Sequence, residues 1–205
     1  MHIVSRDGYE LVDAYSTIET HESLTQWSRE YCSRAIETYE FDVSLGSLDW
    51  EVSTRAKRRA AAVKTPQIDD ATVGEPIDWA SHSQTAPSSG DPPSCTISLS
   101  WRAFESFDRS EWTATLRHEL VHVEQFQAYG TTDHGPAFKR RAEAVDAPVR
   151  VRRFSTPKYV LSCDGCGETV AHRYRDCKLV RQADSYRSSC CKSPLTCNKS
   201  DSVDS

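Results

Sequence analysis

The sequence predicts an α+β fold in which a larger body is followed by a small β-rich unit. Two observations predict the body. Apolar residues recur at helical spacing through residues 110–129, which contain no Gly or Pro, and residues 48–53 and 96–101 alternate between apolar and polar side chains as half-buried strands do. A third observation predicts the separate unit: after Pro148 the composition changes to short apolar runs that carry pairs of cysteines.

The length and composition are those of a soluble globular protein. The chain has 205 residues, 38% of them hydrophobic, including five Trp and eight Tyr, which suits one domain with a small appendage. No run of about 18 apolar residues is present, so no membrane span is expected. The N-terminus has no basic start followed by an apolar core, so no secretory signal is expected and the default location is cytoplasmic.

The first half of the body is expected to hold one helix and one strand. Residues 1–20 are a polar tail, and apolar residues from Leu24 to Tyr39 recur at the spacing of an amphipathic helix whose buried face includes Cys32. Residues 48–53 then form a strand, and a basic cluster follows at residues 54–59.

The second half of the body begins with a loop insertion. Residues 66–94 are rich in Pro, Ser, Thr, Gly and Asp, as long loops are. Residues 96–101 form a second strand, which precedes the long helix, and Gly130 lies where a left-handed cap would end that helix. The body is expected to end at Ala147.

The long helix carries residues that can bind a metal ion. His118, Glu119 and His122 form an H-E-x-x-H pattern. Two histidines four residues apart lie on one face of a helix, so both imidazoles can bind a single Zn²⁺ while the glutamate reaches a water on it. Catalytic zinc sites have three protein ligands and one open position. His134, in a turn before the next helical run, and Glu143, on that run, are the candidates for the third ligand; the extended form H-E-x-x-H-x-x-G-x-x-H is excluded because neither the required glycine nor the third histidine is present.

The cysteines near the C-terminus predict a second zinc site. Cys163 and Cys166 form C-x-x-C-G after a short apolar strand, which is typical of a zinc knuckle. Cys191 is the expected third ligand, and Cys190 or Cys177 is the fourth, since adjacent cysteines rarely bind one ion without backbone strain. Disulfides are not expected in a chain whose cysteines cluster in this way without a signal sequence.

The charges are unevenly distributed. Residues 139–205 contain 14 Lys or Arg against 8 Asp or Glu, whereas the first 138 residues contain 11 against 22. A basic end on an acidic body indicates an anionic partner for that end, and Arg150, Arg152 and Arg153 are its candidate DNA-binding residues.

Taken together, the motifs resemble those of the SprT-like zinc metalloproteases, a family that includes the Spartan-type proteases acting on DNA–protein crosslinks. The resemblance covers most of the chain, from about Leu24 to Leu195. It rests on H-E-L-V-H at 118–122 and D-H-G-P-A-F at 133–138, and it extends to residues 50–61, to residues 96–100 and to the cysteine-bearing tail. The adjacent pair Cys190-Cys191 departs from the family pattern, in which a second C-x-x-C is expected.

The resemblance implies a zincin-like domain over residues 21–147, with a small antiparallel sheet, and a β zinc ribbon over residues 148–196 before a polar tail at 197–205. It implies one catalytic zinc, held by His118, His122 and His134, with Glu119 as general base, and one structural zinc. The expected substrates are proteins bound or crosslinked to DNA. Such enzymes bind the peptide as an extra strand on a sheet edge, for which residues 96–101 are a candidate if they are not an ordinary buried strand.

Two rival functions remain open at this point. One is a general cytoplasmic zinc peptidase with Glu143 as the third ligand, and the other is a non-enzymatic zinc protein that binds nucleic acid. The sequence predicts no oligomeric state.

Overall fold

The computed structural model describes residues 15–81, 91–155 and 157–200. Parts of the expected N-terminal tail, loop insertion and polar C-terminal tail therefore lie outside the described residues. Contacts divide the chain after Phe154 into two compact units. They are called the body and the C-terminal unit below, and each is described by itself.

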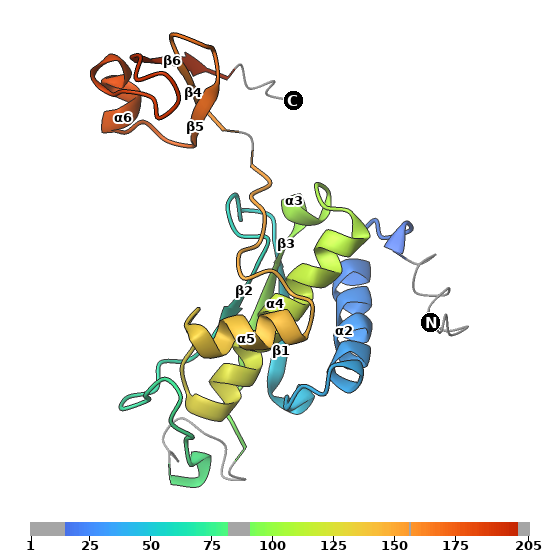
Figure 1. The fold of residues 1–205 in the computed structure, drawn as a ribbon. Coiled ribbons are helices and arrows are strands. Elements are labelled where there is room, and N and C mark those ends of the chain that lie inside the picture. The colour runs from blue at the N-terminus through green and yellow to red at the C-terminus, as the bar shows by residue number, and fades with distance from the viewer. Residues whose placement is uncertain (1–14, 82–90, 156, 201–205) are drawn as a thin grey trace, which may run out of the picture. The chain divides into compact units, whose positions relative to one another are not determined.

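The body has the predicted mixture of helices and strands (Figure 1). Its helices are α2 (His21–Thr38), α3 (Trp101–Phe104), α4 (Arg109–Tyr129) and α5 (Pro136–Ala144), with the 3-10 turns η1 (Leu45–Ser47) and η2 (Trp79–Ser81). Its strands are β1 (Leu48–Ser53), β2 (Ala61–Lys64) and β3 (Cys95–Ser100).

Helix α4 forms the centre of the body. Asp108 and Glu111 form a capping box at its start, which satisfies free N–H groups of the first turn. Gly130 ends the helix in the left-handed conformation at φ 68°, as the sequence predicts, and a side chain there would collide with Ile77. Fourteen of its residues are buried, so the helix is surrounded by the rest of the body and not laid on its surface.

Helix α2 packs against α4 by the face that the sequence predicts. Leu24, Trp27 and Cys32 are buried on it, and the indole N–H of Trp112 on α4 lies 3.3 Å from the hydroxyl of Ser28. Thr20 caps the start of α2 by accepting the backbone N–H of Ser23 at 3.0 Å.

The sheet of the body is mixed, so the prediction of an antiparallel sheet is wrong. The strand order is β1-β3-β2, with β3 parallel to β1 and antiparallel to β2. Because β3 uses both of its backbone edges, it is the buried central strand and cannot accept a further strand. The edge strand beside α4 is β2, which the sequence analysis did not predict.

The body continues beyond its expected end at Ala147. Residues 148–154, called the strap here, have no regular structure, but Val149, Val151 and Phe154 pack on the core of the body. Arg152 donates hydrogen bonds to Glu111 and to the carbonyl of Ser106 and lies 4.5 Å from the ring centre of Phe107. These contacts attach the strap to the body and not to the C-terminal unit.

The C-terminal unit is a three-stranded antiparallel sheet with short turns. It contains β4 (Tyr159–Cys163), β5 (Thr169–Arg173), α6 (Lys178–Arg181), η3 (Ala183–Ser185) and β6 (Leu195–Lys199), in the strand order β5-β4-β6. Strand β6 includes Cys197, which was expected in the polar tail; that expectation is wrong, because Cys197 packs against the small core of the unit. This core consists of Leu161, Ala183 and Leu195, too little apolar burial to stabilise a fold of this size without a further crosslink or metal.

Within the described residues, none of the helices combines the length and apolar character that crossing a bilayer requires.

The burial of the cysteines leads to a first prediction. Cys32 and Cys95 are buried in the body, and burial raises the pKa of the Cys95 thiol to about 11 and raises that of Cys32 further. Since the thiolate is the form that attacks a disulfide reagent, we expect at most the six cysteines of the C-terminal unit to react with such a reagent in folded, metal-free protein. Cys32 and Cys95 should react only after denaturant is added.

The control is a variant in which Cys32 and Cys95 are both alanine, which should gain no reactive thiol on denaturation. Rapid reaction of all eight thiols in folded protein would show that Cys32 on α2 and Cys95 on β3 are not buried.

Candidate metal centres

Three histidine side chains of the body converge on one point. His118 and His122 lie one turn apart on α4, and His134 precedes α5. The Nε2 atom of His134 is 3.3 Å from that of His118 and 3.2 Å from that of His122. Nitrogens held about 2.0–2.1 Å from a tetrahedral zinc ion would be separated by about 3.3 Å. Both separations from His134 match this value, and all three ligand nitrogens lie within 4.8 Å of one another, so one zinc ion could bind all three.

Neighbouring groups hold two of these imidazoles in place through their other nitrogen. The carbonyl oxygen of Pro148, on the strap, is 2.7 Å from Nδ1 of His118. The side-chain oxygen of Gln125 is 3.4 Å from Nδ1 of His122, and the amide of Gln125 donates to Asp133 at 3.0 Å. Such partners fix the ring orientation and leave Nε2 free as a ligand. The contacts of Pro148 and Gln125 were not predicted from the sequence, and Asp133 was indicated only as part of the D-H-G-P-A-F segment.

The two helical histidines are in the form that binds metal. Burial lowers the pKa of His118, and burial together with the neighbouring imidazoles lowers the pKa of His122 to about 4. Both rings are therefore neutral near pH 7, and a neutral imidazole has the lone pair that coordinates zinc.

Glu119 is a buried carboxyl group beside this histidine cluster. Its residue surface is 3% exposed, and burial raises its pKa to about 8. The backbone N–H of Val63 on β2 and the charge of Arg59 act in the opposite direction. A carboxyl group whose pKa lies near neutrality can both accept and return a proton.

Arg117 ties the helix that carries the site to two other segments. Its guanidinium donates to the hydroxyl of Tyr31 on α2 at 2.6 Å and to the carbonyl of Asp146 after α5. Asp146 has a positive φ of 52°, so the chain turns sharply there. This turn leads directly to Pro148, and Arg117 thereby helps to place the carbonyl that holds His118.

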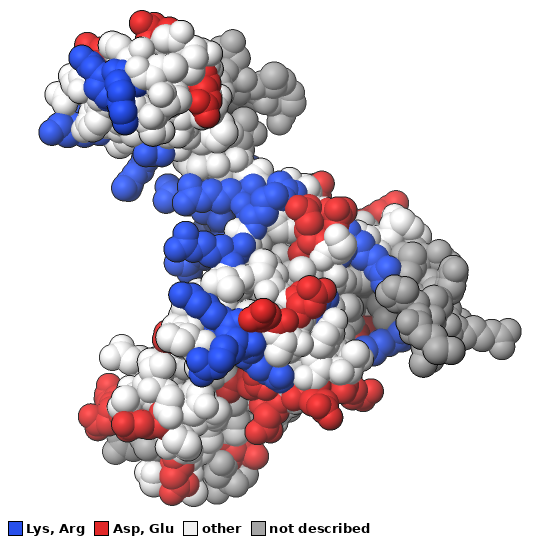
Figure 2. All heavy atoms as spheres, viewed as in Figure 1, with Lys and Arg blue, Asp and Glu red and all other residues white. Residues whose placement is uncertain are grey.

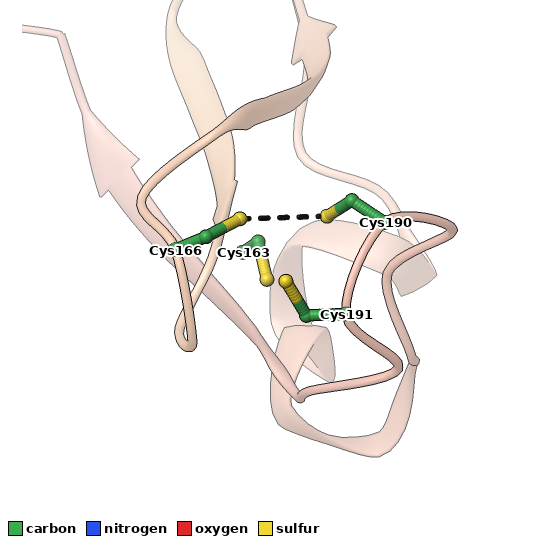
Figure 3. Close-up of side chains that lie close together, drawn as sticks. All are labelled: Cys163, Cys166, Cys190 and Cys191. Atoms are coloured by element: carbon green, nitrogen blue, oxygen red, sulfur yellow. Dashed lines mark hydrogen bonds between the residues drawn. The ribbon is translucent and has the colours of Figure 1, made fainter.

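Four cysteines of the C-terminal unit form a second cluster (Figure 3). Cys163 is the last residue of β4 and Cys166 lies in the turn that follows, whereas Cys190 and Cys191 come from the segment before β6. The sulfur atoms of Cys166 and Cys190 are 3.6 Å apart, and thiolates about 2.3 Å from a tetrahedral zinc would be separated by about 3.8 Å. The cluster therefore has the composition and spacing of a closed structural zinc site.

The structure brings Cys190, and not Cys177, to this cluster. Both adjacent cysteines reach it, and the residue that follows them, Lys192, has a positive φ of 59°. Ser188 accounts for part of the arrangement: its hydroxyl is 3.2 Å from the sulfur of Cys163, and this hydrogen bond, with those from the backbone of Cys166 and Gly165, lowers the pKa of that thiol to about 6. A lowered pKa favours the thiolate, the form that binds metal.

A family comparison agrees with this geometry. The model of the SprT-like family matches residues 21–159, which is more than half of the chain and includes the whole histidine cluster. The chain belongs to the SprT-like family. No individual curated protein and no solved structure matches it significantly. Membership in the SprT-like family indicates a function of the metallopeptidase type.

The histidines and Glu119 of this SprT-like chain open on a cavity of about 490 Å³. Its lining comes from residues 58–63, from α4, from residues 132–134 and from the strap. Arg150, Arg152 and Arg153, which the sequence analysis assigned to DNA binding by the ribbon, line this cavity in the body. Figure 2 shows Lys and Arg gathered together on this view of the body, with Asp and Glu bordering them.

Glu143, the rival third ligand, lies apart from the histidines. It is an exposed residue of α5 and is not among the groups that converge with His118 and His122. His134 occupies the third position instead.

This arrangement yields a second prediction. His134→Ala should lose the zinc of the body, because two imidazoles remain, whereas Glu143→Gln should retain it. Metal content of the purified proteins, measured by mass spectrometry, checks both. Loss of zinc from the Glu143 variant and retention in the His134 variant would reverse the assignment.

A third prediction distinguishes the cysteines of the C-terminal unit. Cys190→Ser should release the second zinc and unfold the unit, because its small core cannot replace the metal. Cys177→Ser is the matched control and should keep a full zinc complement. Loss of zinc from the Cys177→Ser protein instead would show that Cys177, and not Cys190, is the fourth ligand.

Proposed function

We propose that this chain is a zinc-dependent endopeptidase that acts on proteins held on DNA. One observation carries the peptidase part of the proposal: three imidazole nitrogens lie at the spacing of a zinc site, beside a single buried carboxyl group, in an open cavity. Three protein ligands leave the fourth position of a zinc ion accessible, as catalysis requires.

The three histidines and Glu119 each have a role in peptide hydrolysis. His118, His122 and His134 would hold the zinc ion, which polarises a carbonyl group and lowers the pKa of water. Glu119 accepts a proton from the attacking water and returns it to the amine of the leaving product. Burial raises the pKa of Glu119 in the metal-free site, and the positive charge of a bound zinc ion would favour the carboxylate form that accepts the proton.

The substrate would bind as an extended strand along β2. This strand is an edge of the sheet, and it lines the cavity together with Glu119. Apart from the N–H of Val63, which Glu119 binds, the backbone groups on its open edge can pair with a peptide, and the small side chains of Ala61 and Ala62 leave room for one. This assignment replaces the earlier candidate, residues 96–101.

The C-terminal unit would be a zinc ribbon that holds the DNA. Its residues 155–205 include eight Lys or Arg against six Asp or Glu, and basic side chains gather on one side of the unit (Figure 2). After residue 138, Lys and Arg outnumber Asp and Glu, and most of this excess lies in residues 139–154, which belong to the body. Binding to phosphates would therefore depend on the positions of these side chains and not on a large net charge.

Substitution of the general base is the fourth prediction. Glu119→Gln should lower kcat for an unfolded protein substrate by about two to four orders of magnitude, because an amide has nearly the same shape but cannot accept the proton. Zinc content and thermal stability should be retained. Activity above a tenth of the wild-type value would exclude Glu119 as the base.

The contribution of DNA is the fifth prediction. We expect DNA to increase cleavage of a bound protein, and we expect the full-length variant with Arg173, Arg175, Lys178 and Arg181 all changed to Gln to lose much of this increase. Each lost phosphate contact should reduce the slope of log affinity against log salt by about 0.7 on single strands.

The outcomes separate the rival functions. Equal DNA binding by this variant, or cleavage that DNA never changes, would favour a general zinc peptidase. A zinc-loaded chain that binds DNA but cleaves no protein would favour a non-enzymatic zinc protein.

A further inference from the structure

The cavity beside Glu119 differs in charge from the body around it. Residues 1–154 contain 17 Lys or Arg against 24 Asp or Glu, yet five arginines line the cavity: Arg58, Arg59, Arg150, Arg152 and Arg153. The only acidic residues of its lining are Glu119, which is buried, and Asp133, which Gln125 binds. Even with the charge of Arg152 balanced by Glu111, arginines outnumber carboxyl groups in this lining, so the cavity is a positive region in an acidic body.

These arginines come from two segments that lie far apart in the sequence. Arg58 and Arg59 precede β2, the edge strand along which a peptide would lie, and the other three belong to the strap. All five are exposed. Arg152 is also fixed in place, because it binds Glu111 and packs on Phe107. Two separate parts of the fold thus bring guanidinium groups to the lining of one cavity.

The position of the arginines favours a peptide over nucleic acid as their partner. They line the same cavity of about 490 Å³ as His118, Glu119 and His122, so a ligand that enters the cavity and contacts them lies beside the scissile bond. A DNA duplex is broader than its major groove, which is itself about 12 Å wide. A duplex is therefore too broad to enter this cavity. A single strand that entered would exclude the peptide and block hydrolysis.

We propose that these arginines select peptide segments that carry Asp or Glu close to the scissile bond. The proposal rests on the proposed peptidase function and adds its substrate class. Guanidinium groups bind carboxylates through paired hydrogen bonds, and positive charge inside a cavity attracts acidic segments and disfavours basic ones.

Three unstructured fluorogenic peptides test this in the full-length, zinc-loaded protein. They share one central sequence and differ only in their flanking residues, which are four Asp, four Asn or four Lys. We expect kcat/KM to decrease in that order and the differences to lie mainly in KM. The advantage of the acidic peptide should shrink with added salt, because exposed charges are screened over about 10 Å at 0.1 M.

Arginine variants then locate the effect. The double variant Arg58→Gln, Arg150→Gln removes one charge from each segment and should lower the acidic-to-neutral ratio of kcat/KM by about two- to fivefold per arginine. Arg59 is retained, because its charge also acts on Glu119. The matched control is Arg102→Gln, an exposed arginine of α3 outside the cavity lining, and the ratio should not change in it.

Binding of the same peptides to the Glu119→Gln protein, measured by fluorescence anisotropy, decides the question independently of activity. Tighter binding of the acidic peptide, lost in the arginine double variant, supports the proposal even if no peptide is cleaved, in which case the peptidase function alone fails. Equal binding and equal cleavage of acidic and neutral peptides overturn the proposal and leave the peptidase function intact. Competition by an oligonucleotide, with no preference among the peptides, also overturns it and assigns the arginines to nucleic acid.

Discussion

The burial of polar side chains in the middle of a core helix is the constraint on which the rest of this structure depends. Arg117, His118, Glu119 and His122 are all less than a tenth exposed, and burying such groups is costly unless each finds a partner. The partners come from every part of the body: Tyr31 from α2, Val63 from β2, and Asp146 and Pro148 from the chain after α5. Several segments of the fold therefore supply hydrogen-bond partners to the buried polar side chains in the middle of α4.

This constraint explains why the body ends where it does. The strap supplies the carbonyl that orients His118, and the Arg152–Glu111 pair and the apolar contacts of Val149 and Val151 keep that strap in place. A body that ended at Ala147 would lose this partner, and the imidazole would lack the hydrogen bond that fixes its ring.

The sequence alone predicted the elements with strong periodicity and local signals. Helices α2 and α4, the cap at Gly130 and the two longer strands of the body were all found, because spacing, capping residues and alternation are local properties. Strand β2 was missed because it is short and two of its four residues are alanines, which have little preference for a strand. The central position of β3 was missed because strand order depends on pairing between distant segments.

The candidate site was predicted less completely than the fold around it. The H-E-x-x-H pattern indicated three of its residues directly, and the family resemblance indicated His134. Pro148 and Gln125 could not be predicted, since a backbone carbonyl carries no sequence signal and an amide has many partners. Charge counting along the chain was also misleading: it placed Arg150, Arg152 and Arg153 on the ribbon, whereas packing of the strap places them in the cavity.

Zinc titration of metal-free protein, with cleavage of an unfolded protein followed at each step, tests the central claim most directly. The account predicts two zinc ions per chain in the wild type and cleavage that requires both the histidines and the metal. It predicts that His118→Ala binds one zinc ion fewer, keeps its folded C-terminal unit and cleaves nothing. Two zinc ions in the His118 variant, or cleavage by the metal-free chain, would contradict it.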